Sequence, residues 1–198
     1  MTEHHGASFA GADLYGEEFG ADRYVGCRFV DADLTEAHSV GTVFEDCDFS
    51  GAKLNASAHD GTAFLRCRFR KSVWWAATLR ECKLTGSVFE SAVLRPLTVV
   101  GGDWSYVALR GADLAGVDLS ETRLAEADLT DADLTDAVLR GCDLSHVRAA
   151  GVTLCRTDLR GAVLTGVAVD DLHLDGTVID LEQAVLLATA RGAKVLPA

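Results

Sequence analysis

Large hydrophobic residues recur along this chain with a period of five, which matches neither an α-helix nor a simple alternating strand. Every fifth residue from Phe9 to Ile179 gives 35 positions in one unbroken register, which we call the centres. All are large apolar or aromatic residues except Ser39, His59 and Ala149, and every Phe of the protein is among them. An α-helix cannot use this step, because five residues advance about 500° and would scatter the Leu side chains around its surface.

Each period is predicted to form a short extended segment followed by a corner. In the recurring Ala-Asp-Leu, the Ala and the Leu point to one side of an extended chain and the Asp points to the other. Glycine recurs two residues after each centre, and with Gly6 included 16 of the 19 Gly occupy that phase. Because glycine favours turns, the chain is expected to turn there and to wind into a solenoid with an apolar interior.

A slower period of 20 sets the number of segments in each coil. Phenylalanine and cysteine both repeat at this interval, at Phe9, Phe29, Phe49, Phe69 and Phe89 and at Cys27, Cys47 and Cys67. Four segments therefore make one coil, and like residues stack at an inter-strand spacing of roughly 4.8 Å. At that spacing the 35 segments predict a rod roughly 42 Å long.

Three quintets carry a family resemblance: A-D-L-Y-G at 12–16, A-D-L-A-G at 112–116 and A-V-L-T-G at 162–166. They resemble the pentapeptide-repeat family, and the resemblance covers about 170 of the 198 residues. It implies an all-β fold, a right-handed quadrilateral parallel β-helix. We therefore expect a β-helix domain over residues 1–180 and a C-terminal helix and tail over residues 181–198. Membership of such a family says little about function by itself.

The five-residue pattern ends at Ile179, and a helix is predicted after it. Asp180 and Gln183 have capping-box spacing, residues 181–191 are rich in helix formers, and Gly192 stands where a C-cap glycine belongs. The helix would cover the open end of the last coil. Its apolar residues spread further than capping requires, which leaves a monomer cap and a twofold dimer as alternatives. The predicted dimer interface comprises Leu181, Ala184, Val185, Leu186, Leu187 and Ala188.

Length, acidity and the C-terminal helix resemble the Qnr and MfpA type of the family, whose members interact with DNA gyrase. The resemblance implies a homodimer that binds DNA gyrase or topoisomerase IV at surfaces built for duplex DNA. It also implies protection from inhibitors that trap these enzymes. Qnr members interrupt the register with functional loops, whereas this register is unbroken, so the loop-free MfpA-like kind is the closer match.

Charge is distributed in bands along the predicted rod. The net charge of −12 argues against a nucleic-acid binder and suggests either a site that normally accepts a polyanion or simple solubility. Residues 13–48 carry ten acids and two bases, and residues 113–143 carry nine acids and two bases. Residues 49–112 between them carry four acids and nine bases.

The second acidic band contains eight acids that we call the acidic belt. Half of them replace glycine at four successive corners, and half stand in the outward position before a Leu. Solvated Asp suits such positions, which is one explanation for them. The functional alternative is imitation of DNA, with a straight dimeric rod of roughly 80 to 90 Å presenting acids on several faces. The belt comprises Asp113, Asp118, Glu121, Glu126, Asp128, Asp131, Asp133 and Asp136.

The cysteines and a Ser–His pair could carry chemistry, but most of these residues are predicted to be structural parts of the core. Five of the six Cys occupy the inward small-residue position, which predicts free structural thiols. Ser39 and His59 lie at centres one coil apart and are predicted to form a hydrogen-bonded, locally indented part of the core. A catalytic role is not expected, because a solenoid interior offers no cleft. No catalytic, metal-binding or cofactor-binding residue is predicted, and neither an enzyme nor a small-molecule substrate is expected.

The chain shows neither a secretion signal nor a membrane-spanning run of apolar residues, so a cytoplasmic protein without membrane contact is expected.

Trp75 is the outward aromatic residue of most interest. Trp74 occupies the centre, so Trp75 should face solvent among several bases, with Arg95 one coil above it. A cation–π pair between Trp75 and Arg95 and an anchor for a partner protein are the two interpretations. The leading hypothesis is a non-enzymatic, dimeric rod that binds a type II topoisomerase by imitating DNA. The alternative is a general interaction or scaffold module with an unrelated partner.

Overall fold

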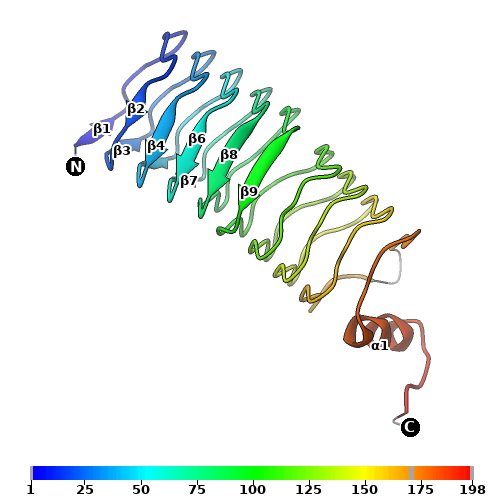
Figure 1. Ribbon diagram of the computed structural model, residues 1–198. Coiled ribbons are helices and arrows are strands. Elements are labelled where there is room, and N and C mark those ends of the chain that lie inside the picture. Colours follow the sequence, from blue (N-terminus) through cyan, green and yellow to red (C-terminus); the bar gives the residue numbers. More distant parts are fainter. Residues whose placement is uncertain (1, 170–171, 197–198) are drawn as a thin grey trace.

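The computed structural model describes residues 2–169 and 172–196 and shows one solenoid with a helix at its C-terminal end (Figure 1). The described elements in chain order are β1 (Glu3–His5), β2 (Glu18–Phe19), β3 (Arg23–Val25), β4 (His38–Val40), β5 (Val43–Glu45), β6 (Ala58–Asp60), β7 (Ala63–Leu65), β8 (Ala77–Arg80), β9 (Leu97–Val100) and α1 (Leu181–Ala190).

All described strand pairs are parallel and form two sheets. One sheet has the order β1-β3-β5-β7 and the other has the order β2-β4-β6-β8-β9. Partners in each pair are 20 residues apart, beginning with Glu3 opposite Arg23. Isolated bridges continue the same interval as far as Asp158 opposite Val178. The predicted coil of four segments is therefore confirmed, and the described pairings contain no insertion.

Strands are confined to two faces of the solenoid and to its N-terminal half. From Asp103 onward the described coils pair through isolated bridges only, and Figure 1 shows them as coils without arrows. The 20-residue interval is the same on both sides of this change. The rod therefore keeps one register although its local hydrogen bonding differs along its length.

The centres form the core, as predicted. Phe9, Phe29, Phe49, Phe69 and Phe89 stack in one column with ring centroids 4.7–5.1 Å apart. This distance equals the spacing of neighbouring strands, so in-register pairing places like rings in contact. Each such aromatic pair contributes roughly 0.5–1.5 kcal/mol to stability in addition to the contribution of its buried area.

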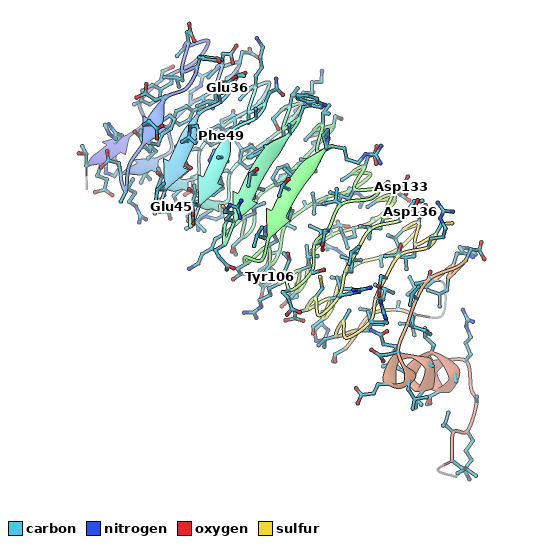
Figure 2. All side chains as sticks on the ribbon, viewed as in Figure 1. Glu36, Glu45, Phe49, Tyr106, Asp133 and Asp136 are labelled. Atoms are coloured by element: carbon cyan, nitrogen blue, oxygen red, sulfur yellow. The ribbon has the colours of Figure 1, made fainter. Side chains whose placement is uncertain are left out.

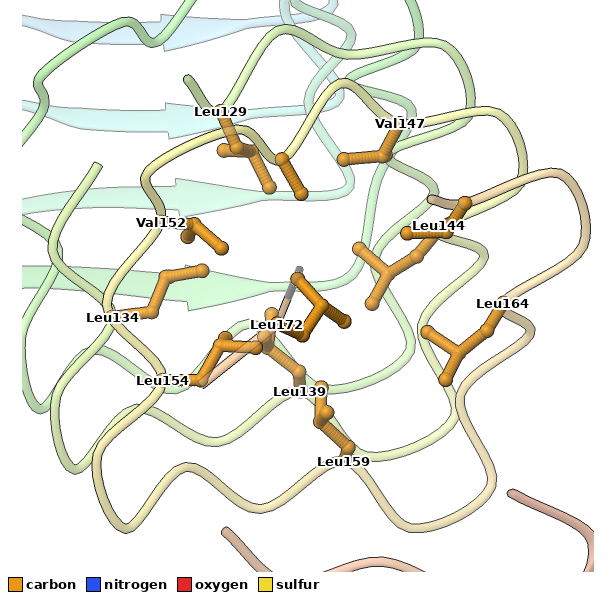
Figure 3. A pocket seen from close by; sticks show the side chains of 12 residues that line it. Leu129, Leu134, Leu139, Leu144, Val147, Val152, Leu154, Leu159, Leu164 and Leu172 are labelled. Atoms are coloured by element: carbon orange, nitrogen blue, oxygen red, sulfur yellow. The ribbon is translucent and has the colours of Figure 1, made fainter. Parts of the chain in front are cut away.

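The interior stays apolar towards the C-terminal end. A cavity of about 30 Å³ lies there (Figure 3). It has room for about one water molecule, and its apolar lining offers that water no partner. This cavity is too small for a ligand. It is lined by Leu129, Leu134, Leu139, Leu144, Val147, Ala149, Val152, Leu154, Leu159, Leu164, Val167 and Leu172.

The cysteines are free thiols, and all except Cys155 are buried. Burial raises the pKa of Cys82 and of Cys142 to about 12, so these thiols stay protonated. The Cys142 Sγ donates to the Leu119 carbonyl in the neighbouring coil at 2.9 Å. These cysteines therefore act as small core residues, as the sequence indicates.

Most described corners adopt a left-handed backbone conformation whether or not they hold glycine, and Ala21 and Pro96 are exceptions. Among the described residues, every non-glycine residue with positive φ stands at a corner, and these φ angles lie between 48° and 61°. Gly102 differs, because it stands at an inward position with φ of 107°. A Cβ atom there would lie 2.3 Å from the Cys82 carbonyl oxygen. Gly102 is therefore required by both conformation and space.

Helix α1 begins and docks as its sequence predicts. The Asp180 side chain accepts from the Gln183 backbone N at 3.0 Å, and the Gln183 side chain accepts from the Asp180 backbone N at 3.1 Å. The Gln183 Nε2 also donates to the carbonyls of Leu159 and Ala162. Together with the buried Leu187, Gln183 fastens α1 to the last coils.

No helix in the described part of the chain is long and apolar enough to cross a membrane.

Candidate interaction surface

The Asp residues that precede a centre have a structural role besides their charge. At ten described positions this carboxylate accepts a hydrogen bond from the backbone N–H two residues later. In the acidic belt, Asp118 accepts from Ser120 at 2.9 Å and Asp133 accepts from Thr135 at 2.9 Å. These Asx turns shape the outward side of each segment. The recurrence of Ala-Asp-Leu therefore has a structural reason.

The four corner acids of the belt lack that structural reason. Glu121, Glu126, Asp131 and Asp136 have φ between 58° and 60°. Glycine adopts this conformation without the steric cost of a Cβ atom, and Glu has no compensating local bond to the backbone. Glu121 and Glu126 in particular occupy corners that backbone conformation alone would assign to glycine.

Three acids of the belt are already paired, which limits their use for a partner. Asp128 is only 7% exposed and lies 3.4 Å from Arg148, so the expectation that it is a solvent-facing charge is wrong. Its burial follows from the Asx turn and from flanking arginine side chains. The Asp136 carboxylate receives both Nε and Nη2 of Arg156 at 2.6 Å. The Asp113 Oδ1 lies 3.2 Å from the Arg95 Nε.

The remaining five acids have no cation within 4.0 Å among the described residues, and we call them the free acids: Asp118, Glu121, Glu126, Asp131 and Asp133. Glu126 accepts a hydrogen bond from the Tyr106 hydroxyl at 2.8 Å. Hydrogen bonds from Thr135 lower the pKa of Asp133, which keeps this carboxylate ionised. The sequence pattern alone did not separate free acids from paired ones. The signal was present, because several pairs, including Asp136 with Arg156, are 20 residues apart and therefore adjacent across coils.

The acids of the belt lie on different sides of the rod. Figure 2 shows Asp133 and Asp136 on the same side as Glu36, whereas Glu45 and Tyr106 lie at the opposite edge. Because Glu126 contacts Tyr106, the free acids extend from one edge to the other. The acidic surface is therefore a ring around the rod and not a single flat patch.

Helix α1 exposes a second candidate surface. Leu181 is 80% exposed, and Val185 and Leu186 are each 39% exposed. Leu187 is buried against the solenoid, so its predicted place in a dimer interface is corrected to a docking role within the chain. The reason is that α1 uses the Gln183 and Leu187 side to reach the last coils. Ala184 and Ala188 are half-buried between the two sides.

Trp75 faces solvent as predicted, with 57% of its surface exposed. The expected stack with Arg95 is not formed among the described contacts. The Arg95 Nη1 donates instead to the Ala115 carbonyl at 2.9 Å, and its Nε lies 3.2 Å from Asp113. The next coil thus offers the guanidinium a carboxylate and a carbonyl, which are stronger partners than a ring face. Trp75 and Arg95 therefore do not stack on each other, and their shared role as an anchor for a partner stays a prediction.

Ser39 and His59 meet in the core, as predicted. The Ser39 Oγ lies 2.6 Å from the His59 Nδ1, and the His59 Nε2 lies 3.0 Å from the Ser57 Oγ. Burial, with a smaller contribution from His38, lowers the pKa of His59 to about 3. No carboxylate joins this network among the described residues, and His59 is only 4% exposed. The arrangement suits a neutral, hydrogen-bonded core site.

The described residues contain no cluster of three or more His, Cys, Asp or Glu side chains that could hold a metal ion.

Comparison with known proteins identifies the class. The family model "Pentapeptide repeats" matches in eight copies over residues 27–58, 105–141 and 142–178, which is more than half of the chain. This chain belongs to the pentapeptide-repeat family, and its fold is the right-handed quadrilateral β-helix expected from the quintets.

Two solved structures of QnrB1, a plasmid-mediated fluoroquinolone resistance protein, are similar over nearly the whole chain. Both are trypsin-treated variants and both are 24% identical to this chain. One has a TM-score of 0.85 and covers 98% of this chain and 99% of its own. The other has a TM-score of 0.84 and covers 98% and 100%. At this identity the likeness shows the fold alone. Among curated proteins, no sequence matches this chain.

Proposed function

We propose that this protein binds a type II topoisomerase, DNA gyrase or topoisomerase IV, at a surface built for duplex DNA. In doing so it gives resistance or self-protection against an inhibitor directed at that enzyme. The observation that carries the proposal is the ring of free acids around an uninterrupted rod. The likeness to QnrB1, which is described as a fluoroquinolone resistance protein, supports this choice of class.

Electrostatics favours a protein site that normally receives nucleic acid. Such sites are cationic, because they neutralise phosphates, and they attract a matching array of carboxylates for the same reason. The corner acids Glu121 and Glu126 strengthen the argument, because the backbone conformation there favours glycine. The paired acids, including Asp128, contribute to folding instead.

The same proposal includes a homodimer formed through α1. Leu181, Val185 and Leu186 present apolar surface at the end of the rod, and a twofold contact would pair each copy of this patch with the other. Joining the rods at their C-terminal ends would double the length of the rod and place one acidic ring in each half. A longer rod matches a longer stretch of a DNA-binding channel.

A supercoiling assay with purified gyrase tests the proposal. The belt-neutral variant combines Asp118→Asn and Asp133→Asn with Glu121→Gly, Glu126→Gly and Asp131→Gly. Asn retains the Asx turn and Gly suits the corner, so the fold should be retained while five charges are removed. Inhibition by the wild type, or relief from a gyrase poison, should be at least about tenfold weaker in the variant, since each exposed pair contributes about 0.2–1 kcal/mol.

The matched control is Glu81→Gly with Asp103→Asn. Glu81 occupies a corner with φ of 48° in the same column as Glu121, and Asp103 forms the same Asx turn with Ser105. Both lie outside the belt, so this variant should behave like the wild type. Equal losses in the two variants would remove the belt from the contact. No effect of the wild-type protein across micromolar concentrations would favour a scaffold module with an unrelated partner.

A further inference from the structure

A cationic and aromatic surface lies between the two acidic bands. Arg68, Arg70, Lys71 and Trp75 are all exposed and fall within eight consecutive residues, and we call them the basic patch. Arg68 and Arg70 flank the buried centre Phe69, and Lys71 occupies the corner with φ of 56°. Trp75 follows on the adjoining face. One coil therefore carries three cations and an indole ring around one edge of the rod.

The charges of the basic patch are poorly compensated within the protein. Arg68 and Lys71 have no ion-pair partner among the described residues. Arg70 has Glu90 at 3.9 Å, which is a weak contact. The neighbouring Arg66, by contrast, has its Nε 2.9 Å from Asp46 and also pairs with Glu45. The patch therefore presents net positive charge although the whole chain carries −12.

Trp75 adds an uncovered ring to these cations. It is 57% exposed, and Arg95, the nearest candidate to cover it from the next coil, is engaged by Asp113. No acceptor binds the Trp75 indole N–H among the described hydrogen bonds. Trp and Arg are the residue types most enriched among the side chains that dominate binding energy.

The flanking bands limit the size of an anionic partner. Acids dominate residues 13–48 on one side and residues 113–143 on the other, so a long polyanion along the rod would be repelled at both ends of the patch. Two coils span roughly 10 Å along the rod at the inter-strand spacing. A short extended peptide that crosses the rod fits this band, because five residues reach roughly 17 Å around its edge.

We propose that the basic patch is a docking site for a short acidic segment of a partner protein. Carboxylates of the segment pair with Arg68, Arg70 and Lys71, and an apolar or aromatic side chain packs on Trp75. The site is separate from the acidic belt. The inference does not depend on the enzyme that the belt binds. It also gives a role to the cationic middle of the rod, whose positive charge does not contribute to imitation of DNA.

Fluorescence anisotropy with a labelled synthetic peptide, Glu-Asp-Glu-Tyr-Glu-Asp-Glu, tests the proposal at low ionic strength. The full chain should bind it saturably. Trp75→Ala and the double variant Arg68→Gln/Lys71→Gln should each weaken binding at least about fivefold. These side chains are exposed, so the variants should retain the fold. Trp74 and Trp104 are buried, so acrylamide should quench mainly the fluorescence of Trp75. Bound peptide should protect Trp75 from this quenching.

The matched control is Arg28→Gln/Arg148→Gln. Both arginines are exposed and lie in the same column as Arg68. Arg148 lies opposite Asp128 of the preceding coil, just as Arg68 lies opposite Asp48. This variant should bind the peptide within about twofold of the wild type. The proposal is overturned if the control loses as much as the patch variants. Absence of saturable binding also overturns it, as does tighter patch-dependent binding of a single-stranded oligonucleotide or loss of self-association in the patch variants.

Discussion

Ser39 and His59 replace large apolar centres in a column that otherwise contains residues such as Phe19, Leu79 and Leu119. Their hydroxyl and imidazole groups are satisfied by each other and by Ser57, which is the condition under which polar groups are tolerated in a core. The neutral state of His59 is part of that arrangement. Protonation would place an uncompensated charge in the apolar interior.

Stability should therefore fall as the pH drops below the unfolded pKa of His59. The folded pKa is lowered to about 3 from an ordinary value of 6.5, so the unfolded state binds the proton first and the stability falls progressively from pH 6.5 down to about 3. At pH 5 the loss is about 2 kcal/mol. Urea unfolding of the wild type and of His59→Leu checks this, because the variant should lose less stability between pH 7 and 5.

Leu is a conservative choice for that variant, since Leu79 occupies the same column. The exposed His173 supplies the control, and His173→Gln should keep the pH dependence of the wild type. Parallel pH profiles for the wild type and His59→Leu would contradict the assignment.

Two glycines should respond very differently to the same substitution. At Gly111 a new Cβ atom meets nothing within 4 Å, whereas at Gly102 it meets the Cys82 carbonyl oxygen at 2.3 Å. Gly111→Ala should cost about 1 kcal/mol, the cost of a left-handed non-glycine residue that many corners already tolerate. Gly102→Ala should cost about 3 kcal/mol or more. Thermal unfolding measures both, and similar melting temperatures would contradict the distinction.

At the scale of elements, α1 has two chemically different sides. Gln183 and Leu187 bind the last coils, whereas Leu181, Val185 and Leu186 remain exposed. The pattern of apolar residues identified the apolar side chains of α1 but could not show which of them face the solenoid. The orientation of the helix depends on the hydrogen bonds from Gln183 to the carbonyls of Leu159 and Ala162. The exposed side is therefore the part of α1 available for association.

Val185→Glu/Leu186→Glu should abolish the proposed dimer without loss of the fold. Charges at these positions would be buried in a twofold contact but remain solvated in the monomer. Light scattering should give a mass near twice 21.0 kDa for the wild type and near 21.0 kDa for the variant. Leu187→Ala, by contrast, should lower stability by about 2–5 kcal/mol through lost packing within the chain. A wild-type mass near 21.0 kDa at micromolar concentration would contradict the dimer.

At the scale of the whole molecule, an uninterrupted rod displays charge in bands. The fold contributes a continuous axis, because each coil pairs with its neighbours at one fixed interval. The belt and the basic patch occupy different lengths of that axis and carry opposite charge. Under the two proposals, one chain would contact a cationic surface and an acidic segment at the same time.

The sequence by itself determined the coil, the core and the terminal helix of this protein. A step of five repeated without interruption allows one packing, since every segment meets a near copy of itself 20 residues away and only one side of the segment is apolar. Local chemistry sufficed for α1 as well, because the capping box of Asp180 and Gln183 is formed within four residues.

Only the tertiary structure decided which outward groups are available. Asp118 and Asp128 occupy equivalent positions before a Leu, yet Asp118 is exposed while Asp128 is buried beside Arg148. Arg95 could contact Trp75 or Asp113, and the geometry of the next coil selects Asp113. Long charged side chains reach across coils, so their partners depend on directions in space that a one-dimensional period does not contain.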